Sequence, residues 1–303
     1  MKVGVNGAVR DISDLKVGVS GAVRVVSEGY AGVGGAMKKI WPLVEALNDC
    51  TWEQISAISS AGTGANYWEV GDCKQVTLNG TVGSLSLSNF STYAFIIGFN
   101  HNSDREGSGR IHFQLAKTAL SGGTDICFTD GSYNSFDSSA AFRMNTSEVN
   151  SGGWKDSYMR NNICGTSKTS TSGRIMGAIP ADLRNALKSV TKYTDNTAND
   201  GGSVSSYVTA TTDFFFLLSE YEVFEYTIRS NRYEENYQQQ YAYYSAGNSE
   251  VKYRHNSTGI AAYWWLRSPN SRSNSGFVCV SDSGSGNTIF SHLSLGFAPG
   301  FCA

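Results

Sequence analysis

The segment YWWLRSPNSRSNSGF, residues 263–277, joins two stretches of opposite character. Its first part carries three aromatic residues and a leucine, and a large apolar side chain stabilises a fold by about 2 to 3 kcal/mol when it is fully buried. Its second part is mostly serine and asparagine, which bury little apolar surface. We therefore expect a core anchor at residues 263–269, followed by a loop-rich segment that the anchor holds in place.

The anchor and the end of the chain predict a fixed frame around this segment. Arg267 and Ser268 are expected to bond neighbouring carbonyls or a carboxylate, while Gly296, Phe297 and Pro299 return to the core. Between the two parts lie small polar residues with a few larger side chains, a mixture typical of antibody paratopes. A Gly/Ser-rich connecting loop without a partner is the alternative. The candidate ligand-binding residues are Asn270, Arg272, Asn274, Gly276, Ser281, Asn287, Ile289, Phe290, His292, Leu293 and Leu295.

The N-terminal stretch, residues 1–41, contains three copies of a 14-residue unit, which begin at Lys2, Lys16 and Tyr30. Each copy is interpreted as a β-hairpin, because a glycine at the second turn position supplies the positive φ that a tight turn needs. One hairpin cannot bury a core. The repeats therefore predict an attachment or oligomerisation arm, with a degenerate linker as the alternative. The expected turns are Asn6-Gly7, Ser20-Gly21 and Gly34-Gly35.

Residues 42–303 are interpreted as a single α+β domain with short helices, small antiparallel sheets and long ordered loops. Thr51 and Gln54 form a capping-box pattern, which predicts a helix that ends at Gly62. Pro180 opens a second expected helix, which runs through Val190.

Strands are expected at residues 74–78 and 93–99 and in the aromatic run that starts at Phe214. The Gly/Ser/Thr/Asn-rich tract that follows residue 99 is expected to be loop-dominated, with one or two short helices. Later tyrosines recur at helical spacing and predict a helical stripe that packs in the core. They are Tyr233, Tyr237, Tyr241 and Tyr244.

The composition of the chain indicates which classes of partner to expect. The formal net charge is only −2 and lysine and arginine form no cluster, so neither nucleic-acid binding nor a polybasic membrane surface is expected. No apolar run has the length of a signal peptide or a membrane span, so we expect synthesis in a cytoplasm and no membrane insertion. A polar or glycan partner fits this composition better.

Catalytic and metal sites are not indicated, and no cofactor is expected. The six cysteines show no metal-ligand spacing, and scattered free thiols with at most one disulfide are predicted. The histidines lack metal spacing as well, and His101 is expected to have a structural hydrogen-bonding role. Glu220, Glu222 and Glu225 border the aromatic run and are expected to be solvated or ion-paired. Asp282 is the only side-chain carboxylate after Glu250, too few for a calcium cage.

Seven motifs carry a resemblance to a known family. They are YWEVGDCKQVTLNG, FIIGFNHN, NSGGWKDSYMR, IPADLRNALKSVTKYT, FLLSEYEVF, YWWLRSP and GFAPGF, and together they span about residues 42–303. This set resembles the variable proteins of diversity-generating retroelements, which carry a C-type-lectin-like (formylglycine-generating-enzyme-like) domain and occur in gut bacteria and their phages. The N-terminal repeats look like modules of phage tail proteins.

The resemblance implies a C-type-lectin-like fold and a variable region at about residues 270–295. In such families, error-prone copying at adenines varies residues encoded by AAY-type codons, which cannot yield Lys, Glu, Gln, Met or Trp. Residues 270–295 contain none of these five types, as the resemblance would require.

The resulting expectation is a phage or prophage receptor-binding protein at the tail tip, which adsorbs to a host-cell surface protein or glycan. Its arm would contact tail components and would suit a homotrimer. A bacterial surface adhesin or a calcium-independent glycan-binding lectin is the alternative. A formylglycine-generating type of oxidase is a third, because those enzymes share the fold. It is disfavoured because the only late cysteines, Cys279 and Cys302, have no acidic or histidine partner nearby in sequence.

Overall fold

The computed structural model of the chain describes residues 46–198 and 202–303, together with the backbone of six short strands between Lys2 and Trp41. These strands pair in sequence order as three antiparallel two-stranded sheets. The expected turns, the side chains of this stretch and the predicted attachment arm lie outside the described residues. The strands are β1 (Lys2–Val5), β2 (Ala8–Asp11), β3 (Lys16–Val19), β4 (Ala22–Val25), β5 (Gly29–Val33) and β6 (Ala36–Trp41).

A five-stranded antiparallel sheet organises the core, in the order β13-β19-β9-β8-β7. The strands expected at residues 74–78 and 93–99 are confirmed as parts of β7 and β8. The expectation of a loop-dominated tract after residue 99 missed β9. Residues 111–116 are buried on both faces, so this strand has no alternating pattern to reveal it. The bounds are β7 (Cys73–Val82), β8 (Leu85–Phe99), β9 (Ile111–Lys117), β13 (Phe215–Phe216) and β19 (Gly300–Cys302).

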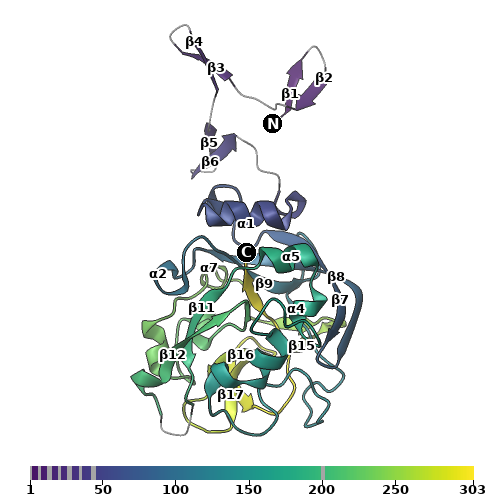
Figure 1. The fold of residues 1–303 in the computed structure, drawn as a ribbon, viewed down its shortest axis with the longest axis vertical. Helices are drawn as coiled ribbons and strands as arrows, with labels where there is room; N and C mark the ends of the chain where they lie inside the picture. Colours follow the sequence, from purple (N-terminus) through teal and green to yellow (C-terminus); the bar gives the residue numbers. More distant parts are fainter. Residues whose placement is uncertain are drawn as a thin grey trace.

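Helix α1 (Trp52–Ser60) packs on this sheet, and the C-terminus lies beside it (Figure 1). The indole ring of Trp52 contacts the rings of Phe113 and Phe301, with centroids 5.5 Å and 5.9 Å away. The predicted capping box is confirmed, because Thr51 and Gln54 each accept a hydrogen bond from the other's backbone amide. The helix ends where expected, just before Gly62 at a φ of 70°.

Two further small sheets and several short helices complete this part of the chain. One small sheet has the order β10-β14-β15, and its strands β10 and β14 run parallel, so the expectation of antiparallel sheets is wrong for this pair. Strands β11 and β12 form an antiparallel pair. The bounds are β10 (Ile126–Cys127), β11 (Val190–Asp195), β12 (Val208–Asp213), β14 (Lys252–Arg254) and β15 (Ser257–Ala262). The remaining α-helices are α2 (Ser103–Glu106), α3 (Gly153–Asp156), α4 (Ile175–Ala178), α5 (Ala181–Ala186), α6 (Glu220–Phe224) and α7 (Ala242–Ser245). Short 3₁₀ helices are η1 (Leu47–Asp49), η2 (Gly64–Asn66), η4 (Ser205–Tyr207) and η5 (Arg232–Asn236), and η3 (Met159–Cys164) is a π-helix.

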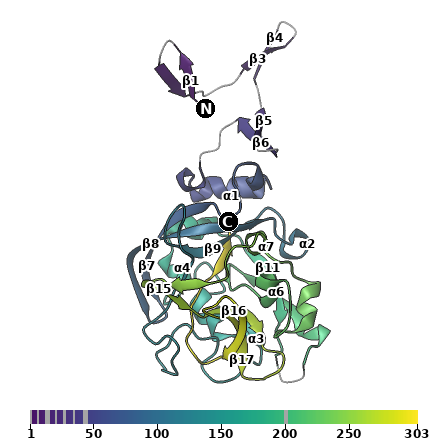
Figure 2. The same ribbon diagram turned by 180° about the vertical axis from the view of Figure 1, so that it is seen from behind.

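A three-stranded antiparallel sheet, in the order β16-β17-β18, carries the C-terminal anchor. Its strands are β16 (Trp264–Pro269), β17 (Gly276–Val280) and β18 (Gly286–Phe290). Figures 1 and 2 view the chain from opposite sides, and in both views β16 and β17 lie at the end of residues 46–303 remote from α1. The two ends of this part of the molecule are therefore built from different sheets.

Two local predictions, the helix that starts at Pro180 and the strand that starts at Phe214, need correction. The helix expected to run through Val190 ends at Ala186, because residues from Val190 onward form β11 and pair with β12. The aromatic run from Phe214 yields only the two-residue strand β13. Ser219 then opens α6 through a capping box with Glu222, which ends the extended backbone.

The tyrosine stripe is not one helix. Tyr233 lies in η5 and Tyr244 in α7, and Tyr241 between them has extended backbone with φ −66° and ψ 139°. Tyr241 and Tyr244 are buried, as expected, whereas Tyr233 and Tyr237 are half-buried. Tyr241 is therefore buried not because it lies on one face of a helix, but because it packs against His101 and Lys192.

The described residues form a mixed α+β structure with several small sheets and short helices. All six cysteines are buried free thiols, so the prediction of scattered free thiols is confirmed. In the part of the chain that the structure describes, no helix is both long enough and apolar enough to cross a bilayer.

Candidate functional site

The predicted anchor is confirmed, because every residue of β16 is buried. Trp264 and Trp265 are completely inaccessible to solvent. The indole N–H of Trp265 donates to the Phe142 carbonyl at 2.8 Å, and that of Trp264 donates to the Glu250 carbonyl at 2.9 Å. Both polar groups are thus satisfied in the core, as buried indoles require.

Arg267 makes the contacts that were expected of it. Its guanidinium donates to the Glu222 carboxylate, at 2.9 Å between Nη2 and Oε1, and to the Leu217 carbonyl, also at 2.9 Å. Burial lowers the pKa of Arg267, but the carboxylates of Glu222, Glu234 and Glu106 together raise it by more, so the net shift is upward and the guanidinium stays charged. A charged pair therefore ties the anchor to α6.

A buried cluster of charges surrounds this pair. The Lys192 ammonium lies 2.6 Å from Glu106 Oε2 and 2.9 Å from Glu222 Oε1, and it donates to the Tyr241 hydroxyl at 2.8 Å. Burial raises the pKa of Glu106 to about 7, against the lowering effect of Lys192. Burial also raises the pKa of Glu222, but Arg267 and Lys192 lower it by more and keep it ionised. The expectation that Glu222 is solvated or ion-paired is confirmed for the ion pair.

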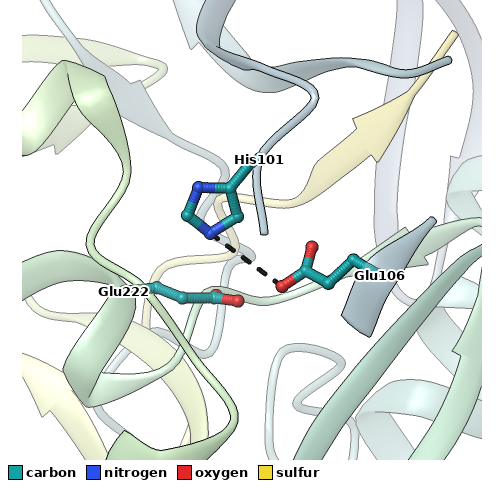
Figure 3. A group of neighbouring side chains, drawn as sticks. All are labelled: His101, Glu106 and Glu222. Atoms are coloured by element: carbon teal, nitrogen blue, oxygen red, sulfur yellow. Dashed lines mark ion pairs between the residues drawn. The ribbon is translucent and has the colours of Figure 1, made fainter. Parts of the chain in front are cut away.

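His101, Glu106 and Glu222 resemble a metal site in their spacing. Figure 3 shows the three side chains converging, and their nearest ligand atoms all lie within 4.8 Å of one another. However, the Lys192 ammonium already bridges both carboxylates. A metal ion would have to displace a cation that is itself fully buried, so these residues do not fit a metal.

His101 lies at the edge of the charged cluster. Its ring stacks on Tyr241, with centroids 3.8 Å apart, and its Nε2 lies 3.9 Å from Glu106 Oε1. Burial lowers the pKa of His101 to about 3, with a further contribution from Lys192. A neutral, stacked imidazole has a structural role, although the buried Nε2 has no hydrogen-bond partner.

The candidate residues of the variable region divide by exposure. Arg272, Asn274 and Phe290 are exposed, whereas Asn270, Asn287, Ile289 and His292 are half-buried. Four candidates are buried rather than exposed: Gly276, Ser281, Leu293 and Leu295. Gly276 and Leu293 nevertheless line the groove described below.

The variable region, residues 270–295, contributes its own residues to the core. Strand β17 is buried at every residue and pairs with both β16 and β18. Phe277 and Val278 are as inaccessible as the anchor tryptophans. The boundary between fixed frame and adaptable surface therefore does not lie at Pro269. The adaptable surface consists instead of the two turns at residues 270–275 and 281–285 and of the outer strand β18.

A second segment, the loop of residues 134–150, completes this surface and was missed by sequence reasoning. This loop lies beside the variable region. The Asn145 amide donates to the Ser291 carbonyl at 2.9 Å, and the Leu295 amide donates to the Phe142 carbonyl at 3.0 Å. The Asn150 side-chain amide donates to three carbonyls of the 270–276 turn: those of Asn270 at 3.1 Å, Ser273 at 2.7 Å and Gly276 at 2.9 Å. One buried amide thus fixes the whole turn.

Three rings gather where the loop meets β18. Phe136 is 70 % exposed and Phe290 is 47 % exposed. The His292 ring lies between them, 4.8 Å from the Phe136 centroid and 6.1 Å from that of Phe290. We call Phe136, Ile289, Phe290 and His292 the aromatic face. Its sequence signal is the phenylalanine in the run NSFDSS, where every neighbour is small or polar.

The aromatic face borders a groove of about 300 Å³. Phe136, Ile289 and Phe290 contribute apolar walls, and Asn270, Ser273 and Thr288 contribute polar groups. Exposed aromatic side chains next to adaptable polar ones are typical of binding surfaces. The arrangement can hold a ligand, and its residues offer no nucleophile paired with a base.

Comparison with known proteins gives one match. Residues 134–302, more than half of the chain, match a family model described as Domain of unknown function (DUF6273). The matched segment starts at the loop of residues 134–150 and includes the whole aromatic face and its supporting sheet. No curated protein and no solved structure matches the chain.

Proposed function

The chain belongs to the DUF6273 family, and from the part of it that this family covers we propose that the protein binds a ligand through the aromatic face. The observation that carries the proposal is the pairing of exposed rings with a completely buried frame. Phe136 and Phe290 expose large apolar surfaces, which soluble proteins seldom keep without a partner. The strands directly beneath them are held by anchors that solvent does not reach.

Rigid support is the feature that makes such a surface useful for binding. Ordering flexible side chains and loops costs free energy on association, so a preorganised frame improves affinity. Here the Asn150 amide and the Trp265 indole hold the two segments of the face before any ligand arrives. Only the side chains at the tips need to adapt.

The finer proposal is a phage or prophage receptor-binding protein with a C-type-lectin-like fold, diversified by a retroelement. The short helices, small sheets and long loops support that fold assignment. The absence of Lys, Glu, Gln, Met and Trp from residues 270–295 supports diversification. In this proposal the partner is a host-cell surface protein or glycan, and residues 1–41 attach the protein to the tail tip. The adhesin and lectin alternatives use the same face.

Binding is favoured over the oxidase alternative by the state of the late cysteines. Cys279 lies in the fully buried strand β17, and burial raises the pKa of its thiol far above the usual range. Cys302 lies in β19 of the other sheet, and burial raises its pKa to about 12. Thiol oxidation chemistry starts from an accessible thiolate, and neither cysteine offers one.

Two experiments test the proposal. Labelled full-length protein is incubated with a panel of gut bacterial strains, and binding to intact cells is measured by flow cytometry. Binding to some strains and not to others is expected, and a panel in which no strain binds would contradict host adsorption. The DNA that flanks the gene is then sequenced. A nearby repeat that differs from codons 270–295 only at adenines supports diversification, and its absence would remove that part of the proposal.

A further inference from the structure

A second concavity, of about 360 Å³, is lined in part by residues 138–143 of the same loop. Its walls are the tip of the β7–β8 hairpin at Gly83 and Ser84, the segment 138–143, and the segment 172–174. No residue lines both this pocket and the groove of the aromatic face. The volume lies in the range of about 300 to 1,000 Å³ that small-molecule sites occupy.

Two arginines line this pocket without a carboxylate partner. In the described residues Arg143 and Arg174 make no ion pair, whereas Arg160 and Arg267 each bind a carboxylate. Arg143 donates to the Ser138 carbonyl at 3.1 Å, and its Nε is buried with no hydrogen-bond partner. Arg174 donates to the carbonyls of Asn161 and Ser172 at 3.1 Å and 2.9 Å. Carbonyls position these guanidiniums but do not neutralise them.

Two carboxylates, those of Asp130 and Asp137, lie close to the pocket without lining it. Asp130 accepts hydrogen bonds from the backbone amides of Ala141 and Phe142, and from the hydroxyl of the lining residue Ser84 at 3.4 Å. Asp137 is exposed to solvent and accepts from the backbone amide of Ser139 at 2.8 Å, which lowers the pKa of its carboxyl, and the charge of Arg143 adds to that lowering. No carboxylate is among the residues that line the pocket. The charged residues of the lining are therefore both cationic, in a protein whose net charge is −2.

Both guanidiniums are held in place before a ligand binds. The Arg143 guanidinium lies over the Tyr158 ring, 5.4 Å from its centroid, which fixes the plane of its fork. Arg174 is fixed by its two carbonyl contacts. Planar guanidinium groups with free N–H donors match the two oxygens of a carboxylate or sulfate.

The rest of the lining is rich in hydroxyl and amide groups. Ser84, Ser139 and Ser172 contribute hydroxyls, and Asn162 contributes an amide. Such groups pair with the hydroxyls of a sugar, and the volume exceeds the need of a lone inorganic anion. We infer that this pocket binds an oxyanion carried on a saccharide, such as the carboxylate of a uronic acid. The inference is independent of the proposed function, because it uses a different set of residues.

The test is a titration of the full chain by isothermal calorimetry at constant ionic strength. The probes are glucuronate, neutral glucose and sodium sulfate. Glucuronate is expected to bind about tenfold or more tightly than glucose, because a charge-assisted hydrogen bond contributes at least that factor. Binding of sulfate alone would support oxyanion recognition with a free anion as the ligand. Binding of none of the probes, or equal binding of glucose and glucuronate, would overturn the inference.

Variants assign the binding to this pocket. Arg143→Gln and Arg174→Gln are each expected to weaken glucuronate binding about tenfold, and Arg232→Gln, an exposed arginine outside the pocket, is the matched control. Ser138→Trp fills the entrance from an exposed position and leaves both charges intact, so it tests the site even if an arginine variant fails to fold. Unchanged affinity in Ser138→Trp and in a folded arginine variant would overturn the inference. The aromatic face should bind cells as before in all of these variants.

Discussion

The indole nitrogen of Trp265 lies 2.8 Å from the carbonyl oxygen of Phe142 and donates a hydrogen bond to it. This contact joins the anchor strand β16 to the loop of residues 134–150, 123 positions earlier in the chain. The two segments that carry the aromatic face are thus fixed to each other through a fully buried side chain. Stability and binding should therefore be separable by mutation.

Replacing the anchor tests the first half of that statement. Trp265→Ala removes a large buried side chain and leaves the Phe142 carbonyl without its donor, so it should lower the free energy of unfolding by about 3 to 5 kcal/mol. Urea unfolding followed by circular dichroism measures this. Phe290→Ala, at an exposed ring, is the control and should change stability by less than about 0.5 kcal/mol. Equal stability of the two variants would show that the frame does not depend on the anchor.

Asn150 is expected to hold the 270–276 turn. Asn150→Ala leaves three carbonyls without their shared donor and should cost about 1 to 3 kcal/mol in unfolding free energy. Asn150→Asp should cost more, because it brings a carboxylate against the same carbonyl oxygens. Asn248→Ala removes a single bond to the Tyr243 carbonyl at an exposed site and serves as the control. A similar cost for Asn150→Ala and Asn248→Ala would contradict the role of Asn150.

Lys192 should be essential to the charged core. Lys192→Met leaves Glu106 and Glu222 buried together with one cation fewer, and loss of one partner from such a cluster costs about 3 to 5 kcal/mol. Lys155→Met, at an exposed lysine, is the matched control for thermal unfolding. The melting temperature of the wild-type chain should not change with a chelator, because the ammonium holds the place of a metal. A large drop with chelator would contradict this assignment.

Stability should respond to pH through Glu234. Burial raises the pKa of this carboxyl to about 7, whereas hydrogen bonds from the Asp195 amide and the Ser268 hydroxyl act in the opposite direction. Between pH 4.5, its ordinary value, and pH 7 the folded state binds the proton more tightly than the unfolded state does, so this group loses stability as pH rises. His101 acts with the opposite sign between pH 3 and 6.5, since its pKa is lowered to about 3.

The contribution of Glu234 is isolated by comparing variants across that pH range. Glu234→Gln cannot ionise, so its free energy of unfolding relative to the wild type should rise by about 3 kcal/mol at most from pH 4.5 to pH 7. The neighbouring Glu235→Gln, at an exposed site in η5, should follow the wild-type curve. A constant difference between Glu234→Gln and the wild type would show that folding does not raise the pKa of this carboxyl.

Local signals made part of the fold predictable. The capping box at Thr51 and Gln54 satisfies backbone donors within one turn of the chain, so no distant contact is needed to specify it. The anchor at Trp264 and Trp265 was predictable because side chains of that size have few stable positions outside a core. A second capping box, at Ser219 and Glu222, is equally local, and it lies within the aromatic run that was predicted to be a strand.

Other features depend on contacts between distant residues. The Asn150 amide meets its carbonyl partners about 120 positions later, and nothing near Asn150 in the sequence indicates them. Lys192 sits in a strand whose burial alternates, and its charge is tolerated only because Glu106 and Glu222 converge on it from other elements. Burial of Leu295 follows from the backbone bond of that residue to Phe142. Contacts of this kind form only in the folded chain, so local sequence patterns do not predict them.

The most direct test of the account is the binding of a face variant to a bacterial strain that the wild-type chain recognises. Phe136→Ser combined with Phe290→Ser removes both exposed rings, whereas Ile228→Ser combined with Ile260→Ser removes two exposed apolar side chains elsewhere. Both double variants should unfold within about 1 kcal/mol of the wild type, since exposed substitutions cost little. The face variant should lose about tenfold or more in cell binding, and the control should lose none. Equal binding by the face variant and the wild type, with both folded, would contradict a ligand site at the aromatic face.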